Sequence, residues 1–203
     1  MELWVGAVNL GLLYAFMAMG VYVSFRIFDF PDVTVDGSLT TGAAVGAVLL
    51  VVGVRPLAVL PAAVAAGLLT GAATALIHTK LNVNGLLAGI LVMTGLYSVN
   101  LHIMGRANIP LLKKETLFSW LARLDPGLPG ELWVLVVLLA LMSLFWLLVT
   151  WFLRTDLGVT MRATGDNPAM VSASGVDVDR MKLFGIALSN GLVALSGALV
   201  AQY

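Results

Sequence analysis

The sequence has no cysteine and few charged residues. Charged side chains make up 11% of its 203 residues and hydrophobic ones 60%, whereas a typical soluble domain is about 25% charged. So few polar groups cannot cover the surface of a soluble domain, and such an apolar chain would not stay disordered in water. The absence of cysteine excludes a disulfide framework and thiolate chemistry. We therefore expect an integral membrane protein.

An excess of one sign of charge is also missing. The 11 basic residues balance the 11 acidic ones, so no basic field indicates a nucleic-acid partner. There is no phosphate-binding loop of the GxxxxGK(S/T) type, and His78 and His102 lack metal-ligand spacing. No carboxylate falls deep within an apolar run, which argues against a proton or sodium relay. We expect no metal, no cofactor and no enzymatic activity in this chain.

Long runs without charge divide the sequence into six segments. Each has about the 20 residues that a helix needs to cross the hydrocarbon core, and each is continuously apolar instead of alternating, which favours helices over strands. The predicted spans lie near residues 3–25, 38–54, 56–78, 84–105, 132–153 and 183–203. The sequence thus predicts one all-α domain, 1–203, a polytopic membrane helix bundle. Because the last run has no polar flank, we expect the chain to be truncated at its C-terminal end.

Glycine pairs recur four residues apart within the predicted helices. Such pairs let helix backbones approach closely in lipid. The simplest interpretation is close packing within one bundle, and a seam between two copies is the alternative. The pairs are Gly42 and Gly46, Gly67 and Gly71, and Gly85 and Gly89.

A path for a solute would need polar groups near the centre of the bundle, although most polar residues in spans only bond to neighbouring helices. The predicted path residues are Thr94, Ser98, Asn100 and Asn190. They belong to a wider polar set that also includes Asn9, Tyr14, Thr70, Thr74, Tyr97 and Gln202.

Three aspartates, Asp29, Asp32 and Asp36, lie in the connection between the first two predicted spans. We interpret them as part of a solvated turn that caps a helix, with Ser38 as a further capping residue. A role in binding a substrate or an ion is the alternative.

Residues 106–131 form a long connection after the fourth predicted span. Apolar side chains alternate there with basic and acidic ones, which predicts a short amphipathic helix on the outer face of the membrane. A turn rich in proline and glycine, 126–130, follows. The simplest role is a surface anchor, and docking of an external partner is the alternative.

The connection 154–182 carries the strongest local signals. Asp166 or Asn167 can cap a helix that has Pro168 at its first position. Gly175 is suited to end that helix, and a second helix can start at Asp177 or Asp179. We therefore predict a short, rigid helix that projects from the bundle between two spans and fits a groove on another protein, in preference to an ordinary loop.

The residues of this connection resemble a known family. Residues 161–171 read MRATGDNPAMV, followed by SGVD at 174–177 and by a span that starts FGIALSNGL at 184. This stretch is similar to the cytoplasmic loop of ATP-binding cassette (ABC) importer permeases of the branched-chain amino acid and ribose family. The segment VDGS at 35–38 resembles the entry to the second helix in that family, and Met170 and Val171 stand where many members carry alanines.

The resemblance implies a transmembrane permease subunit in the bacterial inner membrane, carrying a small polar solute such as an amino acid. A separate cytoplasmic ATPase, an extracytoplasmic solute-binding protein and a second permease copy would be its partners. The helix of the 154–182 loop would be the coupling helix to the ATPase. The residues implied in coupling are Arg162, Gly165, Asp166, Asn167, Pro168, Ala169, Met170, Val171 and Gly175. Of these, Arg162, Asp166 and Asn167 would fix the loop, and residues 168–171 would form its contact face.

Three other classes of protein stay open at this point. A secondary transporter or channel not driven by ATP would show buried charge in its spans. A membrane enzyme would show a polar cluster at the end of a span, and a scaffold would share only the packing. Charge decides the orientation weakly, because six basic residues fall on the side of the 154–182 loop and five on the other. That difference favours a cytoplasmic 154–182 loop and an external N-terminus.

Overall fold

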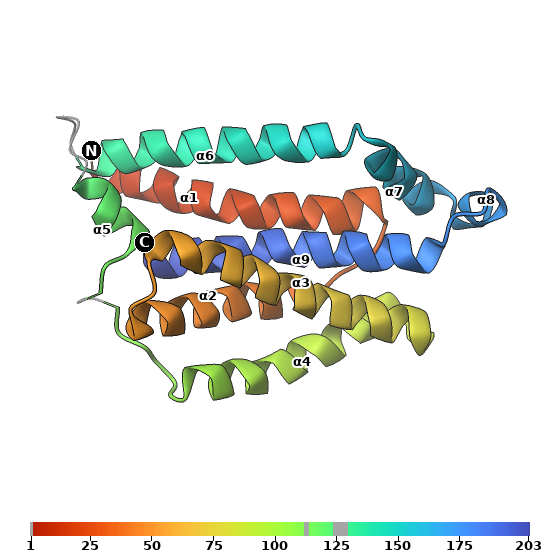
Figure 1. The fold of residues 1–203 in the computed structure, drawn as a ribbon, viewed down its shortest axis with the longest axis horizontal. Helices are drawn as coiled ribbons and strands as arrows, with labels where there is room; N and C mark the ends of the chain where they lie inside the picture. The colour runs from red at the N-terminus through yellow and green to blue at the C-terminus, as the bar shows by residue number, and fades with distance from the viewer. Residues whose placement is uncertain (1, 112–113, 124–129) are drawn as a thin grey trace.

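The computed structural model describes residues 2–111, 114–123 and 130–203, and all its regular elements there are helices. Six of the described helical stretches are long and apolar enough to cross a membrane. This confirms the predicted all-α bundle with six candidate spans (Figure 1). The elements in chain order are α1 (Glu2–Val21), the π-helical turn η1 (Tyr22–Ile27), α2 (Thr34–Val52), α3 (Pro56–Lys80), α4 (Gly85–Met104), α5 (Leu117–Ala122), α6 (Gly130–Phe152), α7 (Asp156–Asp166), α8 (Pro168–Ala173) and α9 (Val178–Gln202).

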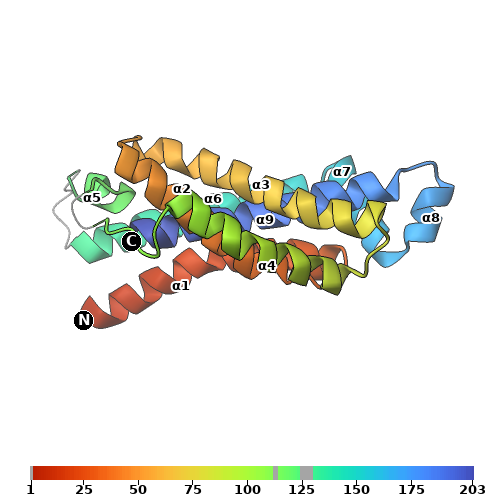
Figure 2. The ribbon, with the colours of Figure 1, turned by 90° about the horizontal axis from the view of Figure 1, so that it is seen from below.

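Helix α9 forms the centre of the bundle, with α1, α2 and α3 packed around it (Figures 1 and 2). Glycines make this possible, because a Cβ atom on Gly42 would meet the Ala194 carbonyl, and one on Gly71 would meet the Ile186 carbonyl. Gly67 lies in the same way against the Asn190 carbonyl. The glycine pairs of α2 and α3 therefore serve close packing within one bundle, as the simpler interpretation of the sequence held.

Helix α2 begins inside the bundle. The predicted second span starts near residue 38, but the helix starts at Thr34, after a connection, 28–33, that runs from the end of η1 into the bundle. The ring of Phe28 packs on Gly185 near the start of α9, and the Asp32 side chain already reaches Asn190, midway along α9. Figure 1 accordingly shows α2 beside only one half of α9. Ser38 is a buried residue of the second turn, so its predicted role as a helix cap is wrong.

Helix α9 also starts earlier than predicted. It includes residues 178–182, which the predicted span from 183 to 203 leaves out because three of the five are charged. The Asp177 side chain accepts a hydrogen bond from the Arg180 backbone N–H at 3.1 Å and so caps the helix before the apolar run begins. Capping, rather than hydropathy, therefore sets the start of α9. The expected second start at Asp177 is confirmed.

The short helix α5 closes one end of the bundle. Its cap is Thr116, and its apolar residues Leu117, Phe118 and Leu121 are buried in the core cluster that includes Leu199 of α9. The apolar face of this helix therefore packs on the bundle instead of lying free on the membrane face. Part of the expected amphipathic segment, 112–113, and most of the expected turn, 126–129, lie outside the described residues.

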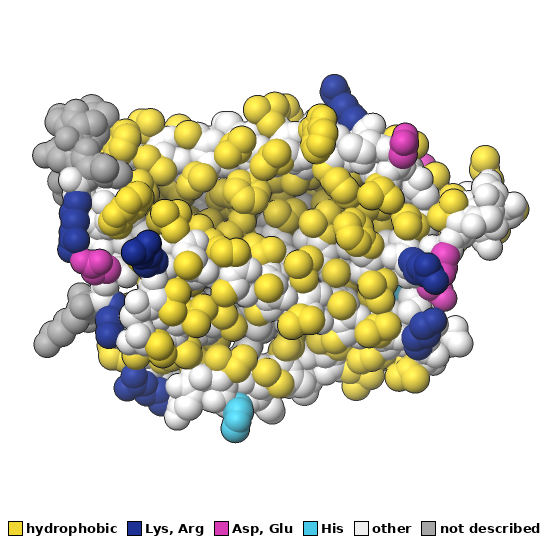
Figure 3. Space-filling model, viewed as in Figure 1, with side chains coloured by type: hydrophobic (Ala, Val, Ile, Leu, Met, Phe, Trp, Pro, Cys, Tyr) yellow, Lys and Arg dark blue, Asp and Glu magenta, His cyan; other side chains and the backbone are white. Residues whose placement is uncertain are grey.

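Charged side chains lie at the two ends of the molecule, and apolar side chains cover the surface between them in the view of Figure 3. An apolar band of this kind is the surface that a membrane-spanning bundle presents to lipid. Helix α6 carries the most apolar of the six candidate spans and is mostly exposed along it. The long axis of the bundle is therefore the direction that crosses the membrane.

Candidate functional site

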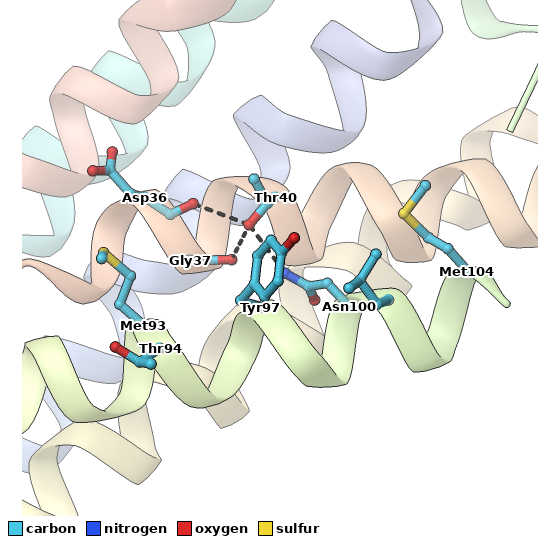
Figure 4. Close-up of a pocket in the computed structure, with 9 residues that line it drawn as sticks. Asp36, Gly37, Thr40, Met93, Thr94, Tyr97, Asn100 and Met104 are labelled. Carbon is cyan, nitrogen blue, oxygen red and sulfur yellow. Dashed lines mark hydrogen bonds between the residues drawn. The ribbon is translucent and has the colours of Figure 1, made fainter. Parts of the chain in front are cut away.

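A largely apolar pocket of about 540 Å³, bordered by several polar side chains, opens between α2 and α4 (Figure 4). Polar side chains from both helices converge on it in an otherwise apolar bundle. Its lining residues are Asp36, Gly37, Thr40, Met93, Thr94, Tyr97, Asn100, Leu101 and Met104. Pockets of this size with a few convergent polar groups are typical of sites for small molecules.

The pocket depends on Gly37 and on the four-residue spacing of Asp36 and Thr40 along α2. Asp36 and Thr40 are four residues apart, so they lie on one face of α2, while Gly37 lets α2 approach α4 at Met93. The Asn100 side-chain amide donates a hydrogen bond to Thr40 Oγ1 at 3.0 Å, which joins the two helices. Asn100 is 7% exposed, and its Oδ1 atom has no hydrogen-bond partner among the described residues. The pocket is therefore bordered by Asn100, whose Oδ1 atom is buried and unsatisfied, and by the exposed residue Asp36.

A second set of polar residues lies inside the bundle and holds the start of α2 through hydrogen bonds. Asn190 donates to Asp32 Oδ2 at 2.6 Å and accepts from the Ser38 hydroxyl at 2.6 Å. The hydroxyl of Ser38 is also 2.6 Å from that of Thr70, and Thr34 and Thr74 pair at 2.7 Å. We call these six residues, Asp32, Thr34, Ser38, Thr70, Thr74 and Asn190, the buried polar network.

Asp32 is only 9% exposed and also accepts a hydrogen bond from the Thr34 backbone N–H at 2.9 Å. Asp32 thus bonds the first backbone N–H of α2, whose N-cap residue is Val33, and it does so in the interior, so its assignment to a solvated turn is wrong. Asp32 lies between two candidate spans and not within one, so a search of the apolar runs does not find this buried carboxylate. The charge-free windows placed 28–36 outside the bundle, whereas the structure folds this segment into it.

The structure separates the four predicted path residues. Thr94 and Asn100 line the α2–α4 pocket, whereas Ser98 is exposed on α4 outside the pocket lining. Asn190 is fully buried in the polar network and does not reach the pocket. Sequence reasoning missed Thr40 and left Asp36 in a loop. The spacing of Asp36 and Thr40 on one helical face was the available signal, hidden because the helix was expected to start later.

The 154–182 loop contains a helix that the hydropathy pattern did not indicate. Helix α7 is capped by Thr155, and its residues Met161 and Thr164 are buried. Gly165 lies against the Ile27 carbonyl at the end of η1, where a Cβ atom would not fit. Arg162 and Asp166 belong to this helix and are exposed. Helix α7 therefore seats the loop on the end of the first span.

Helix α8 projects from the same end of the bundle (Figures 1 and 2). The Asn167 side chain accepts from the Met170 backbone N–H at 3.0 Å, Pro168 is at the first helical position, and Gly175 has a φ of 84° just after the helix. The predicted caps of this helix are confirmed.

Pro168, Ala169 and Met170 are exposed, and Met170 is exposed to 69%. Val171 is 7% exposed, so its expected place on the contact face is wrong, and it anchors α8 instead. The Val171 side chain lies on the side of this short helix that packs against the rest of the loop.

Comparisons with known proteins bear on this arrangement of helices. The family model for the branched-chain amino acid transport system permease component matches residues 4–203. The chain belongs to this permease family. The tyrosine transport system permease protein of Clostridioides difficile is 41% identical over 95% of the chain, which spans 62% of that relative's length.

Two further relatives extend the comparison. An uncharacterized protein of Rickettsia prowazekii is 37% identical over the full chain and 69% of its own length. The ribose import permease protein RbsC of Escherichia coli is 27% identical over 83% of the chain and 51% of its own length. No solved structure matches the chain significantly. The family is one of transport subunits, and together with the six apolar helices it makes this chain a multi-pass protein of the bacterial inner membrane.

Proposed function

We propose that this protein is the permease subunit of an ABC importer and forms part of the path of a small polar solute. The observation that carries the proposal is α8, a short exposed helix held rigidly by its caps between two candidate spans of a chain in this permease family. Its exposed residues Pro168, Ala169 and Met170 offer a small, largely apolar surface to a partner outside the candidate spans. A cytoplasmic ATPase is the partner that the family supports.

The contacts of the loop support a route for coupling. Helix α7 contacts η1 through Gly165 and Ile27, and η1 leads directly into the 28–33 connection. That connection is tied to α9 by the hydrogen bond between Asp32 and Asn190. A displacement of α8 by the ATPase would therefore reach the start of α2, which borders the α2–α4 pocket. ATP hydrolysis belongs to the partner subunit in this proposal.

The α2–α4 pocket is the proposed path surface, with Thr94 and Asn100 lining it and Ser98 beside it. The exposed carboxylate of Asp36 lies within the candidate span of α2, where contact with lipid would be costly. We therefore propose that a second permease copy covers this face. Asn190 would act indirectly, by holding the start of α2. An extracytoplasmic binding protein would deliver the solute, and the tyrosine transport relative makes an amino acid the solute class to test first.

The test uses the complete transporter with its ATPase and binding protein in proteoliposomes. Met170→Glu places a charge on the exposed face of α8, so ATP-driven uptake and stimulated ATP hydrolysis are expected to fall at least about tenfold, since one unpaired buried charge costs several kcal/mol. Met170→Leu keeps the apolar volume and is expected to behave as the wild type. Unchanged uptake in Met170→Glu would rule out α8 as the coupling helix.

A secondary transporter is the second candidate, because the structure places one carboxylate, Asp32, inside the bundle. Buried carboxylates are the usual groups for coupling to protons or cations. Here the two oxygens of Asp32 are already bonded to Thr34 and Asn190. Uptake driven by a proton or sodium gradient in the absence of ATP would favour this candidate.

A further inference from the structure

A groove of about 490 Å³ lies between α1 and α6. In the view of Figure 1 these two helices are on the other side of α9 from α2 and α4, so a second copy that covers the α2–α4 pocket leaves the groove free. Its lining is largely apolar and includes Met19 of α1 and Met142 and Trp146 of α6, whereas Arg162 of α7 borders one end.

The groove runs along half of the candidate span of α6. Met142 stands near the middle of α6, and Leu153, which also lines the groove, follows its last residue. These two residues are 11 positions apart, which corresponds to about 16 Å of helix. The hydrocarbon core of a bilayer is about 30 Å thick. The groove therefore has the length of one leaflet, from the middle of the bilayer to the end of the bundle that carries α7.

The side chains of the groove suit a lipid tail. Ala15 and Ala18 lie on one face of α1, with Tyr22 one turn further along, and the two small side chains leave the hollow between the helices. Trp146 is exposed to 57% and Tyr22 to 51%, so no part of the described chain covers them. Lipid tails are as apolar as leucine side chains, so an acyl chain fits this surface.

Arg162 stands at the end of the groove beside α7. It is exposed. The ion pairs of the described residues join Arg123 to Glu115 and Arg180 to Asp177, so the guanidinium of Arg162 has no carboxylate partner among them. A free guanidinium where the polar headgroups of lipids lie is a binding group for phosphate.

Two further arginines stand close to this end. Arg26 on η1 and Arg154 after α6 each follow a lining residue of the groove by four positions, and both are exposed. Of the two acidic residues on α7, Asp166 lines a separate pocket beside α8, and Asp156 lies in the first turn. With Arg162 included, three basic residues stand against Asp156, so this end of the groove is positively charged.

We propose that the α1–α6 groove holds one acyl chain of an anionic phospholipid, whose phosphate binds the guanidinium of Arg162. Arg26 and Arg154 contribute to the positive field around that phosphate. Basic pockets between membrane helices are known to bind anionic lipid headgroups. The site does not depend on the transported solute. Only its assignment to the cytoplasmic leaflet rests on the proposed function, through the orientation of α8.

A membrane-spanning helix of a protein partner fits the groove less well. Such a helix would contact α1 and α6 through both leaflets, whereas the lining ends near the middle of α6 at Met142. Its apolar side chains would also cover Arg162 without supplying a counter-charge, which is costly away from water. A phospholipid of one leaflet matches both the length of the groove and the charge at its end.

The test uses Trp146 as the probe, because bromine on an acyl chain quenches the fluorescence of a tryptophan that it contacts. The complete transporter is placed in phosphatidylcholine vesicles with a small fraction of brominated phosphatidylglycerol or brominated phosphatidylcholine. The difference between the wild type and Trp146→Phe isolates the signal of this residue. We expect Trp146 to be quenched preferentially by brominated phosphatidylglycerol.

Arg162→Gln is expected to lower this preference about fivefold, the change that one basic residue produces at an anionic membrane surface. Arg106→Gln is the matched control, since Arg106 follows α4 at the opposite end of the bundle, and it is expected to leave the preference unchanged. A second variant, Ala18→Leu, fills part of the groove and leaves α7 and all three arginines intact. It is expected to reduce quenching by brominated phosphatidylglycerol to the level of phosphatidylcholine.

Three results would overturn the inference. Equal quenching of Trp146 by the two lipids in the wild type would show contact with bulk lipid and no site. Absence of quenching by either lipid would show that protein covers the groove. A preference that persists in both Arg162→Gln and Ala18→Leu would place the anionic lipid elsewhere. None of these measurements requires ATP or a solute, so each of these results would leave the proposed transport function standing.

Discussion

Asn190 joins three segments of the chain at one point. Its side chain bonds to Asp32 in the 28–33 connection, to Ser38 on α2 and to the Ile186 carbonyl in α9. Asp32 and Ser38 are buried, and each would lose one of its hydrogen-bond partners without the asparagine. Within a bundle that has little other polar surface, this residue specifies where the second span begins.

We predict that Asn190→Ala destabilises the permease by about 1–3 kcal/mol, because it removes the hydrogen bond to one oxygen of a buried carboxylate and one of the two bonds of a buried hydroxyl. The check is a double-mutant cycle with Asp32→Ala, read from reversible unfolding of the purified protein in detergent. The double variant is expected to lose clearly less stability than the sum of the two single variants. Strict additivity would show that the two side chains do not interact.

Residue-level features differ in how far the sequence predicts them. Gly175 was predicted directly, and Asn167 and Asp177 were each one of two predicted caps, because a cap depends on neighbours within three residues. The bond between Asn190 and Asp32 joins residues 158 positions apart, and no local pattern points to it. For the same reason Asn100 could be selected as a polar span residue, but its hydrogen-bond partner Thr40, 60 positions away, could not be assigned to it.

At the scale of helices, contact between α9 and its neighbours depends on the absence of side chains. Gly42 of α2 faces the Ala194 backbone, and Gly197 of α9 faces the Leu39 carbonyl. The two helices therefore touch through their backbones along this seam. Close backbone contact of this kind is the main source of helix association in lipid, where the hydrophobic effect between helices is absent.

Gly42→Ala is expected to separate α2 from α9 and to lower the yield of folded, monodisperse protein in size-exclusion chromatography. Gly95→Ala on α4 is the matched control, since nothing lies within 4 Å of a Cβ atom there. Alanine also favours a helix by about 1 kcal/mol over glycine, so Gly95→Ala should be neutral or stabilising. Equal behaviour of the two variants would contradict the tight α2–α9 seam.

Charge-free windows found the six candidate spans because lipid requires long apolar helices. They failed at the starts of α2 and α9, where the side chains of Asp32 and Asp177 bond backbone N–H groups of the first turn and hydropathy does not set the boundary. They also missed α7, whose composition is polar, although Thr155 gave a capping signal. Charge-free windows detect segments that can face lipid. The starts of α2 and α9 and the whole of α7 are instead determined by contacts with other parts of the protein.

At the scale of the whole molecule, the connections fall at two opposite ends. Helices α7 and α8 lie at one end, together with the end of η1 and the α3–α4 connection, where His78 and Lys182 come within 3.3 Å. Helix α5 lies at the other end. The six basic residues on the first side and the five on the second give only a slight preference for orientation. The proposed coupling role of α8 demands that its end face the cytoplasm.

The orientation can be measured with single cysteines, since the chain has none of its own. Ser172→Cys lies on α8 and Asn108→Cys follows α4 at the opposite end; both positions are exposed, and neither change alters the charge balance. In intact cells, a membrane-impermeant maleimide is expected to label the thiol at position 108 and not the one at position 172, and opening the cells should expose the latter. Labelling at position 172 in intact cells would place α8 outside, where no ATPase can reach it, and would refute the coupling proposal whatever the pocket binds.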